Sequence, residues 1–325
     1  MEKEALVSIK CLVYNHELYL RECLNGFVMQ KTSFKFEVIV HDDASTDGSA
    51  DIIKEYAEKY PNIIKPIYEK ENQYSKQDGS LSKIINDINC GKYIALCEGD
   101  DYWIDPLKLQ KQVDFLENHE DYGLIYTDVN VFLQEKNIFK RNYISSGELK
   151  RSYSFLDHLK NTGYIAPCTW LFRSELSNSI KKGCIDGTFA LALDIWANSK
   201  IYYLPQVTAV YRILEESASH TKSLQNKYLR NNGVFQIQKD FMIKYPNLVT
   251  KRSENEILKK GYKKILPFAI ILEKKEFIES AQLFFINDRN YIFYLILKIR
   301  KILCLKFIFT LLYKIRKTFR KYLLK

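Results

Sequence analysis

Hydrophobic residues along the first 130 positions form short runs, and the segments between the runs have helical spacing. The runs predict buried strands at residues 6–13, 36–40, 63–68, 93–97 and 123–129. The intervening segments place apolar side chains three and four positions apart, which predicts helices at residues 18–29, 52–60, 81–89 and 106–118. Strands that alternate with helices indicate an α/β fold, with a mainly parallel sheet flanked by helices on both faces.

The pattern changes after residue 130. Residues 130–151 are polar and predict a loop or hairpin. Beyond them we expect helices at residues 155–160 and 189–197 and strands at 168–172 and 201–211, the last broken at Pro205. Residues 216–290 lose strand character and predict a helical extension. The expected organisation is one α/β domain at 1–215, with halves at about 1–130 and 131–215, then the extension at 216–290 and a tail at 291–325.

Charge and cysteine content narrow the class of protein. The apolar fraction of 46% supports a sizeable core, and seven cysteines without a Cys-x-x-Cys spacing indicate reduced thiols rather than a zinc site or a disulfide framework. The charged N-terminus leads directly into a strand, so we expect no signal peptide. The net charge of +10 comes from residues 291–325, which hold ten Lys or Arg and no acid. The rest of the chain is balanced, and no nucleic-acid partner is expected.

The tail at 291–325 has the pattern of a basic amphipathic helix. One face carries Leu305, Ile308, Leu312, Ile315, Phe319 and Leu323, and the other carries Lys306, Lys314, Lys317, Arg320 and Lys321. Its longest charge-free runs, 291–297 and 307–313, fall short of the roughly 20 residues that span a bilayer. We therefore expect a cytoplasmic protein that lies on the anionic inner face of the cell membrane. The alternative is a helix docked on the rest of the chain by its apolar face.

Two of the predicted strands end in clusters of carboxylates. The strand at 93–97 is followed by Glu98, Asp100 and Asp101, and the strand at 36–40 by Asp42 and Asp43. Ligands bind at the carboxyl ends of strands in open α/β sheets, and neighbouring carboxylates repel unless a cation neutralises them. A divalent metal at one end and a nucleoside at the other would explain both clusters. The alternative for the cluster at residues 98–101 is a solvated acidic turn before the helix that starts at Pro106.

The order and spacing of these motifs resemble the inverting glycosyltransferases of family 2, which have the GT-A fold. The matching segments are Val13-Tyr14-Asn15, residues 42–49 (DDASTDGS), residues 91–94 (GKYI) and residues 98–106 (EGDDYWIDP). The last segment is most similar to bacterial enzymes that build capsules and lipopolysaccharide O-chains. A further similarity, at Tyr203-Leu204-Pro205 and Val210-Tyr211-Arg212, extends into the segment that closes the acceptor half in those enzymes.

The resemblance implies a role for each matching residue. It assigns nucleotide-sugar binding to Val13, Tyr14, Asn15, Asp42, Asp43, Lys83, Glu98, Asp100 and Arg212. Asp42 or Asp43 would contact the base, and Asp100 and Asp101 would bind ribose and a diphosphate-bound Mn²⁺ or Mg²⁺. His220 is a further candidate ligand of the metal, or a surface residue. Trp103 would line the acceptor pocket, or pack in the core, and Arg212 would contact the diphosphate or pair with a nearby acid.

The implied reaction is one displacement at the anomeric carbon, with a UDP-sugar as the expected donor and a lipid-linked surface glycan as the acceptor. A base must remove the proton of the attacking hydroxyl, a step worth roughly 10²–10⁴-fold in rate. The candidates are Asp186, at the junction of a loop and a helix, and Asp194, inside that helix, where an aspartate is expected to face solvent. We favour Asp186, although its spacing from Tyr203 departs from the family pattern.

Two other functions remain open from the sequence. A nucleotidyltransferase also uses acidic strand ends, but the chain has no Gly-rich loop with Lys or Arg after the first strand to hold a triphosphate. A catalytically degenerate domain could instead act as a basic membrane- or nucleic-acid-binding protein. Intact acidic motifs argue against degeneration.

Overall fold

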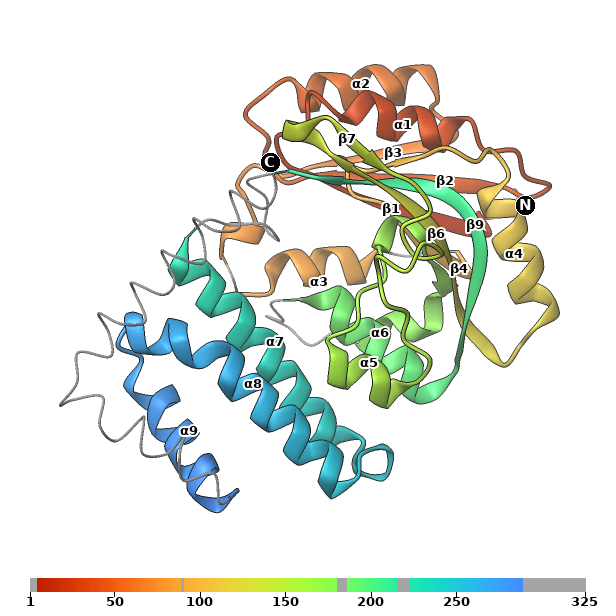
Figure 1. Cartoon of the computed structure of the whole chain (residues 1–325). Helices are drawn as coiled ribbons and strands as arrows, with labels where there is room; N and C mark the ends of the chain where they lie inside the picture. The colour runs from red at the N-terminus through yellow and green to blue at the C-terminus, as the bar shows by residue number, and fades with distance from the viewer. Residues whose placement is uncertain (1–4, 77, 89–90, 180–185, 215–222, 289–325) are drawn as a thin grey trace. The chain divides into compact units, whose positions relative to one another are not determined.

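The computed structural model describes residues 5–76, 78–88, 91–179, 186–214 and 223–288 (Figure 1). The chain divides into two compact units, Met1–His220 and Thr221–Lys325. The second unit consists of helices in its described part, as the sequence predicts. The tail at 291–325 and His220 lie outside the described residues.

A nine-stranded sheet forms the centre of the first unit, and its strands run in the order β3-β2-β1-β4-β8-β6-β9-β5, with β7 beside β6. The strands are β1 Val7–Val13, β2 Phe36–Asp42, β3 Ile64–Tyr68, β4 Tyr93–Leu96, β5 Tyr102–Trp103, β6 Tyr122–Leu133, β7 Ile138–Lys140, β8 Leu171–Arg173 and β9 Lys200–Ile213. Pairing is parallel from β3 to β4 and between β6 and β9, and antiparallel where β5, β7 and β8 join. The predicted α/β class is confirmed, and the short strands β5, β7 and β8 make the sheet mixed.

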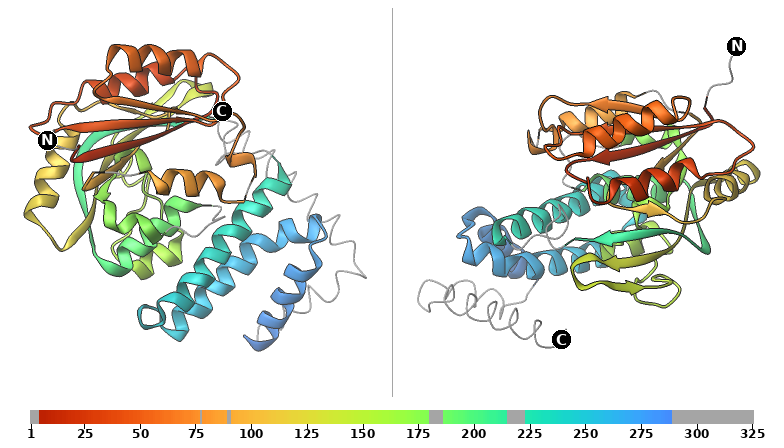
Figure 2. Two further views of the ribbon diagram at one scale, coloured as in Figure 1. Left: turned by 180° about the vertical axis from the view of Figure 1, so that it is seen from behind. Right: turned by 90° about the horizontal axis from the view of Figure 1, so that it is seen from above.

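Helices cover both faces of this sheet. The helices of the first unit are α1 Leu20–Val28, α2 Ser49–Lys59, α3 Ser80–Asp87, α4 Lys108–Asn118, α5 Phe155–Asn161 and α6 Gly187–Asn198. Figures 1 and 2 show α1 and α2 on one side of the sheet and α3, α5 and α6 on the other. In α1, buried Leu20, Cys23, Leu24 and Phe27 form the stripe that faces the sheet, as helical spacing requires.

The strand that contains Pro205 is longer than predicted and does not break. β9 continues past Pro205 because the register with β6 shifts there: Thr127 pairs with Leu204, whereas Asp128 pairs with Val207. The extra residues form an irregularity of the β-bulge type, which accommodates a proline that has no N–H to donate. Figure 1 shows β9 as the long curved ribbon that results.

The core of the first unit is continuous and largely apolar, and buried free thiols contribute to it at Cys11, Cys23, Cys97 and Cys168. The second unit has its own core between α7 Leu224–Lys244, α8 Lys251–Ile271 and α9 Lys275–Asn287. Gly261 allows α7 and α8 to approach closely, since a Cβ at this position would lie 2.1 Å from the ring of Phe235.

Candidate functional site

The loops that follow β1 and β2 are bound to each other by hydrogen bonds. Asn15, which has a φ of +56°, accepts a bond from the N–H of Thr46 through Oδ1 (2.8 Å) and donates its own N–H to Ser45 Oγ (2.9 Å). Two residues further along, the N–H of Glu17 donates to the carboxylate of Asp47, and the carboxylate of Glu17 accepts the N–H of Gly48. Since β1 and β2 are adjacent parallel strands, their carboxyl ends emerge together, and the predicted residues Tyr14 and Asn15 are held beside residues 42–48.

The structure distinguishes the two aspartates at the end of β2. Both carboxylate oxygens of Asp43 accept backbone N–H groups, from Gln73 at 2.7 Å and from Tyr74 at 3.0 Å. Asp42 accepts one bond, from the N–H of Ser45 to Oδ1 at 3.2 Å. Both oxygens of Asp43 therefore bind the backbone of residues 73 and 74, whereas Oδ2 of Asp42 takes no part in these hydrogen bonds.

The acidic loop after β4 packs closely against the first loop. A Cβ at Gly99 would lie 2.7 Å from His16 Nδ1, so a larger residue would have to displace the His16 ring. On either side of it, Glu98 is exposed and Asp100 is half-buried. The three loops after β1, β2 and β4 thus form one contiguous surface at the carboxyl ends of neighbouring strands.

Asp101 is the buried member of the acidic loop, with 4% of its surface exposed. Its Oδ1 accepts the backbone N–H of Arg212 at 2.8 Å. Burial raises the pKa of Asp101 well above its usual range, and the neighbouring Asp100 and Glu98 raise it further. A positive charge near this loop would therefore be stabilised by relief of the repulsion between its carboxylates.

Arg212 is held by neighbouring protein groups. Its guanidinium donates to the carbonyl of Asp100 at 2.9 Å, to Gln134 and to Glu22 at 2.6 Å. It also lies over the rings of Tyr19, Tyr102 and Phe132 at 4.7, 5.3 and 5.5 Å. Of the two roles left open by the sequence, this geometry supports the pairing with a nearby acid. Through it, Arg212 fixes the backbone of the acidic loop.

The remaining predicted residues occupy different environments. Val13 is buried at the end of β1, Tyr14 is 46% exposed beside the loops, and Lys83 is exposed on α3. Trp103 is 2% exposed, and its Nε1 donates to the carbonyl of Cys168 at 2.8 Å. Its indole packs edge-on against Phe27 with ring centroids 4.9 Å apart, which supports the core alternative rather than an open acceptor pocket.

Both candidate bases belong to α6. Asp186 is the N-cap residue, whose carboxylate accepts the N–H of Phe189 and the hydroxyl of Thr188, each at 3.0 Å. Asp194 is 2% exposed, so the expectation that it faces solvent is wrong. The reason is that α6 is apolar on most of its surface and is surrounded by protein at this position.

Several residues of the first unit have distinctive environments although the sequence analysis assigned them no role. Tyr211 and Tyr164 form a ring pair with centroids 5.8 Å apart, and Cys168 lies against Asp101. Asp128, fully buried on β6, accepts the N–H groups of Ile144 and Ser145. Asp128 interrupts an apolar run, which is a detectable signal, whereas nothing in the sequence distinguishes Tyr164 from other loop tyrosines.

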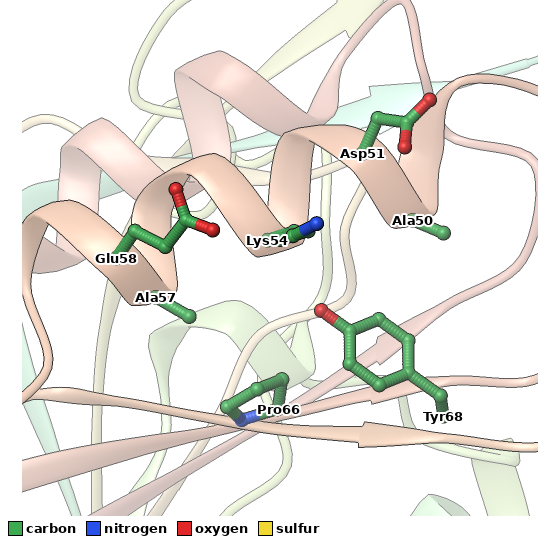
Figure 3. A pocket seen from close by; sticks show the side chains of 7 residues that line it. All are labelled: Ala50, Asp51, Lys54, Ala57, Glu58, Pro66 and Tyr68. Carbon is green, nitrogen blue, oxygen red and sulfur yellow. The ribbon is translucent and has the colours of Figure 1, made fainter.

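A separate hollow of about 510 Å³ lies between α2 and β3. Figure 3 shows the Tyr68 hydroxyl pointing toward Lys54 on α2, with Asp51 and Glu58 on the same helix. None of the predicted site residues lines this hollow, and so the candidate site remains the surface formed by the three loops.

Comparison with known proteins places these features in a family context. The family model described as glycosyl transferase family 2 matches residues 8–180. An uncharacterized protein of Mycobacterium tuberculosis is 35% identical over 207 residues, which are 63% of this chain and 58% of that protein. The chain thus spans less than two thirds of the length of such curated relatives. A Bacillus subtilis protein named for teichuronic acid biosynthesis, TuaG, is 28% identical over 67% of this chain and 82% of its own length.

Solved structures share the fold at low sequence identity. Residues 1–349 of Staphylococcus aureus TarS, crystallised with UDP-GlcNAc, match with a TM-score of 0.50 and 17% identity, over 80% of this chain and 81% of TarS 1–349. The mannosyltransferase PcManGT of Pyrobaculum calidifontis, in complex with GDP-Man and Mn²⁺, matches with a TM-score of 0.53 and 16% identity, over 86% of this chain and 76% of PcManGT. At this level of identity the likeness establishes the GT-A architecture.

Proposed function

The chain belongs to glycosyl transferase family 2, and from this premise we propose that it transfers a sugar from a nucleotide-diphosphate sugar to a growing cell-surface polysaccharide. The observation that carries the proposal is the contiguous surface made by the loops after β1, β2 and β4, where acidic side chains gather at the carboxyl ends of parallel strands. The names of the relatives support the polysaccharide context, since TuaG and GgaB are named for teichuronic and minor teichoic acid biosynthesis.

The donor nucleotide is proposed to lie along the first two loops. Asp42, with an oxygen outside the contacts of its own loop, would contact the base, while Asp43 holds residues 73 and 74 in place. The exposed ring of Tyr14 and the rigid Asn15 loop would border the nucleoside, and Lys83 would approach the phosphates from α3. TarS with UDP-GlcNAc and PcManGT with GDP-Man support a nucleotide sugar as the ligand class, with a UDP-sugar as our first choice.

A divalent cation, Mn²⁺ or Mg²⁺, fits the acidic loop. Burial and then repulsion from Asp100 and Glu98 raise the pKa of Asp101, and a cation would relieve the repulsion; carboxylate oxygens are the donors that such cations prefer. Across the part of the chain that the structure describes, no three His, Cys, Asp or Glu side chains converge as a cage. The donors suit a site in which Asp100 and Asp101 supply protein ligands and the substrate diphosphate completes the shell. When bound, the metal would neutralise charge on the departing diphosphate.

The proposed reaction is a single displacement with inversion. The acceptor oxygen forms a bond to the anomeric carbon as the bond to the diphosphate oxygen breaks, and the acceptor proton passes to a carboxylate. Asp186 and Asp194 are both retained as candidates for that carboxylate. Asp194 is buried, while the carboxylate of Asp186 already caps α6, so a base at Asp186 would share its oxygens with the helix.

A lipid-linked acceptor and a peripheral position on the inner face of the membrane remain part of the proposal. The basic amphipathic pattern of residues 291–325 supports them. In the described segments, no helix combines the length and the hydrophobicity needed to cross a bilayer.

The test is release of nucleoside diphosphate from a panel of UDP- and GDP-sugars by the full chain, with and without Mn²⁺. Asp101→Asn should abolish release while leaving the fold intact, because asparagine keeps the oxygen that accepts the N–H of Arg212 but not the charge. Asp51→Asn, at the exposed α2 hollow, is the matched control and should match the wild type. Full activity of Asp101→Asn would remove the acidic loop from the mechanism.

A further inference from the structure

One aromatic residue near the acidic loop is exposed at the point where the chain enters a buried segment. Tyr164 is 39% exposed, whereas Ile165, Ala166 and Cys168 are 5%, 1% and 0% exposed. These residues lie between α5 and β8, and Cys168 precedes β8, which begins at Leu171 and not at 168 as the sequence predicts. A tyrosine that stays exposed where such a segment begins is suited to contact a ligand rather than to complete the core.

The segment that carries Tyr164 is held firmly in place. The indole of Trp103 donates to the carbonyl of Cys168 at 2.8 Å, and the hydroxyl of Thr169 donates to the carbonyl of Ala166 at 2.7 Å. On the other side of Tyr164, the N–H of Gly163 donates to the carbonyl of His158 at 2.9 Å. Trp103, the aromatic residue that the sequence suggested for the acceptor pocket, therefore anchors the segment on which the exposed tyrosine lies.

Tyr164 is connected to the acidic loop through Tyr211. Their ring centroids are 5.8 Å apart with an interplanar angle of 54°. Burial raises the pKa of Tyr211, and Asp101, Glu98 and Asp100 raise it further. Tyr211 directly precedes Arg212, whose backbone N–H donates to Asp101 at 2.8 Å, so the ring pair lies beside the acidic loop.

These contacts describe a surface with an apolar face and a polar edge. The exposed ring of Tyr164 supplies the apolar face, and the Tyr211 hydroxyl and the carboxylates supply the edge. A pyranose ring has the same division, with C–H groups on its faces and hydroxyls around its rim, and a rigid aromatic ring with a few polar groups is typical of sites for such ligands. The nucleoside is assigned to a different place, beside Tyr14 and Asp42.

We propose that Tyr164 is the platform on which the acceptor's terminal pyranose stacks, with the Tyr211 hydroxyl directed to the rim of that sugar. The inference rests on the proposed transferase function and specifies its acceptor as a pyranose held by ring stacking. In this proposal Tyr164 binds the acceptor, and the acidic loop binds the donor.

The direct test is saturation-transfer difference NMR of the full chain with methyl pyranosides of glucose, galactose, mannose and N-acetylglucosamine. The variants are Tyr164→Ala and Tyr164→Leu, which remove the flat ring, and Tyr164→Phe, which keeps it. Tyr153→Ala is the matched control, because Tyr153 is 69% exposed and its described ring contact is to Arg151. If Tyr164→Ala fails to fold, Tyr164→Leu carries the test.

We expect the wild type, Tyr164→Phe and Tyr153→Ala to transfer equal saturation to at least one pyranoside. Loss of the ring should weaken binding about 3- to 10-fold, as expected for one aromatic contact. Unchanged binding in Tyr164→Ala or Tyr164→Leu would overturn the inference, and so would a wild type that binds none of the pyranosides. Thermal stabilisation by nucleotide sugars is measured on the same samples. Its absence would count against the transferase function separately from the acceptor subsite.

Discussion

Replacement of Arg212 tests how the acidic loop is held. Its side chain is 4% exposed and joins the carbonyl of Asp100, Gln134 and Glu22 in one set of hydrogen bonds. Arg212→Met keeps most of the apolar length but removes all three donors. Arg212→Lys keeps the charge, but a single ammonium replaces the planar guanidinium. It can therefore bond to only some of the three acceptors.

The magnitude follows from the environment of each partner. Glu22 is 58% exposed at its side chain, so its ion pair contributes at most about 1 kcal/mol. The bonds to Asp100 and Gln134 are sheltered, and the loss of each costs about 1–2 kcal/mol. We therefore expect Arg212→Met to lower the free energy of unfolding by about 3–4 kcal/mol and Arg212→Lys by about 2–3 kcal/mol. A misplaced acidic loop should also slow sugar transfer by about 10²-fold.

Urea unfolding followed by tryptophan fluorescence measures the first quantity, since Trp103 and Trp170 are buried in the same unit. Nucleoside diphosphate release measures the second. Glu22→Gln is the matched control and should lose less than about 1 kcal/mol. A stable Arg212→Met protein with normal transfer would refute the reasoning. A stable Arg212→Lys protein that loses only nucleotide affinity would instead indicate direct contact with the diphosphate.

Three further predictions use groups whose environment is unusual. Burial lowers the pKa of His158 to about 4, so between about pH 6.5 and 4 only the unfolded chain binds a proton at this side chain. The free energy of unfolding should therefore fall by up to about 3 kcal/mol as the pH drops through that window. Urea titrations of His158→Gln should lack this component. Burial lowers the pKa of Lys108 to about 7, so the cost of its buried charge is greatest below pH 7. Lys108→Met should raise the free energy of unfolding by about 1–3 kcal/mol at pH 6 and by less at pH 9. An equal or larger gain at pH 9 would contradict the assignment. Asp43→Asn should lower the free energy of unfolding by about 1–3 kcal/mol, because one of its two bound backbone N–H groups loses its acceptor. Asp42→Asn should lower it by less than about 1 kcal/mol. The same variant should abolish stabilisation by nucleoside diphosphates in thermal melts.

The sequence predicted the parts of the fold that depend on local pattern. The strands β1 to β4 and the first helices follow from apolar runs and helical spacing, and the acidic strand ends meet because parallel neighbours end at one edge. The expected break at Pro205 is wrong, because a sequence does not say whether a strand ends or bulges at a proline. That outcome depends on the partner strand β6, whose register shifts at Asp128.

The side-chain environments could not be predicted in the same way. Lys108 is a polar residue in a helix, and the local pattern does not mark it as buried. Its ammonium nevertheless lies 4.2 Å from the ring centre of Trp103 and donates to Gln112 inside the core. Asp194 and Trp103 are buried for a related reason, since their surroundings come from segments distant in sequence. Burial of a polar group depends on partners supplied by the whole fold, and a local pattern does not contain them.

The most direct test of the central claim is thermal stabilisation of the full chain by nucleoside diphosphates and their sugars, with Mn²⁺, with Mg²⁺ and with a chelator. A ligand that binds only the native state stabilises by about 2.7 kcal/mol at 100 times its dissociation constant. We predict stabilisation by one nucleotide carrier and its sugar, larger with metal, and loss of the metal-dependent part in Asp101→Asn. A folded sample that no nucleotide stabilises would contradict the proposal of a nucleotide-sugar transferase.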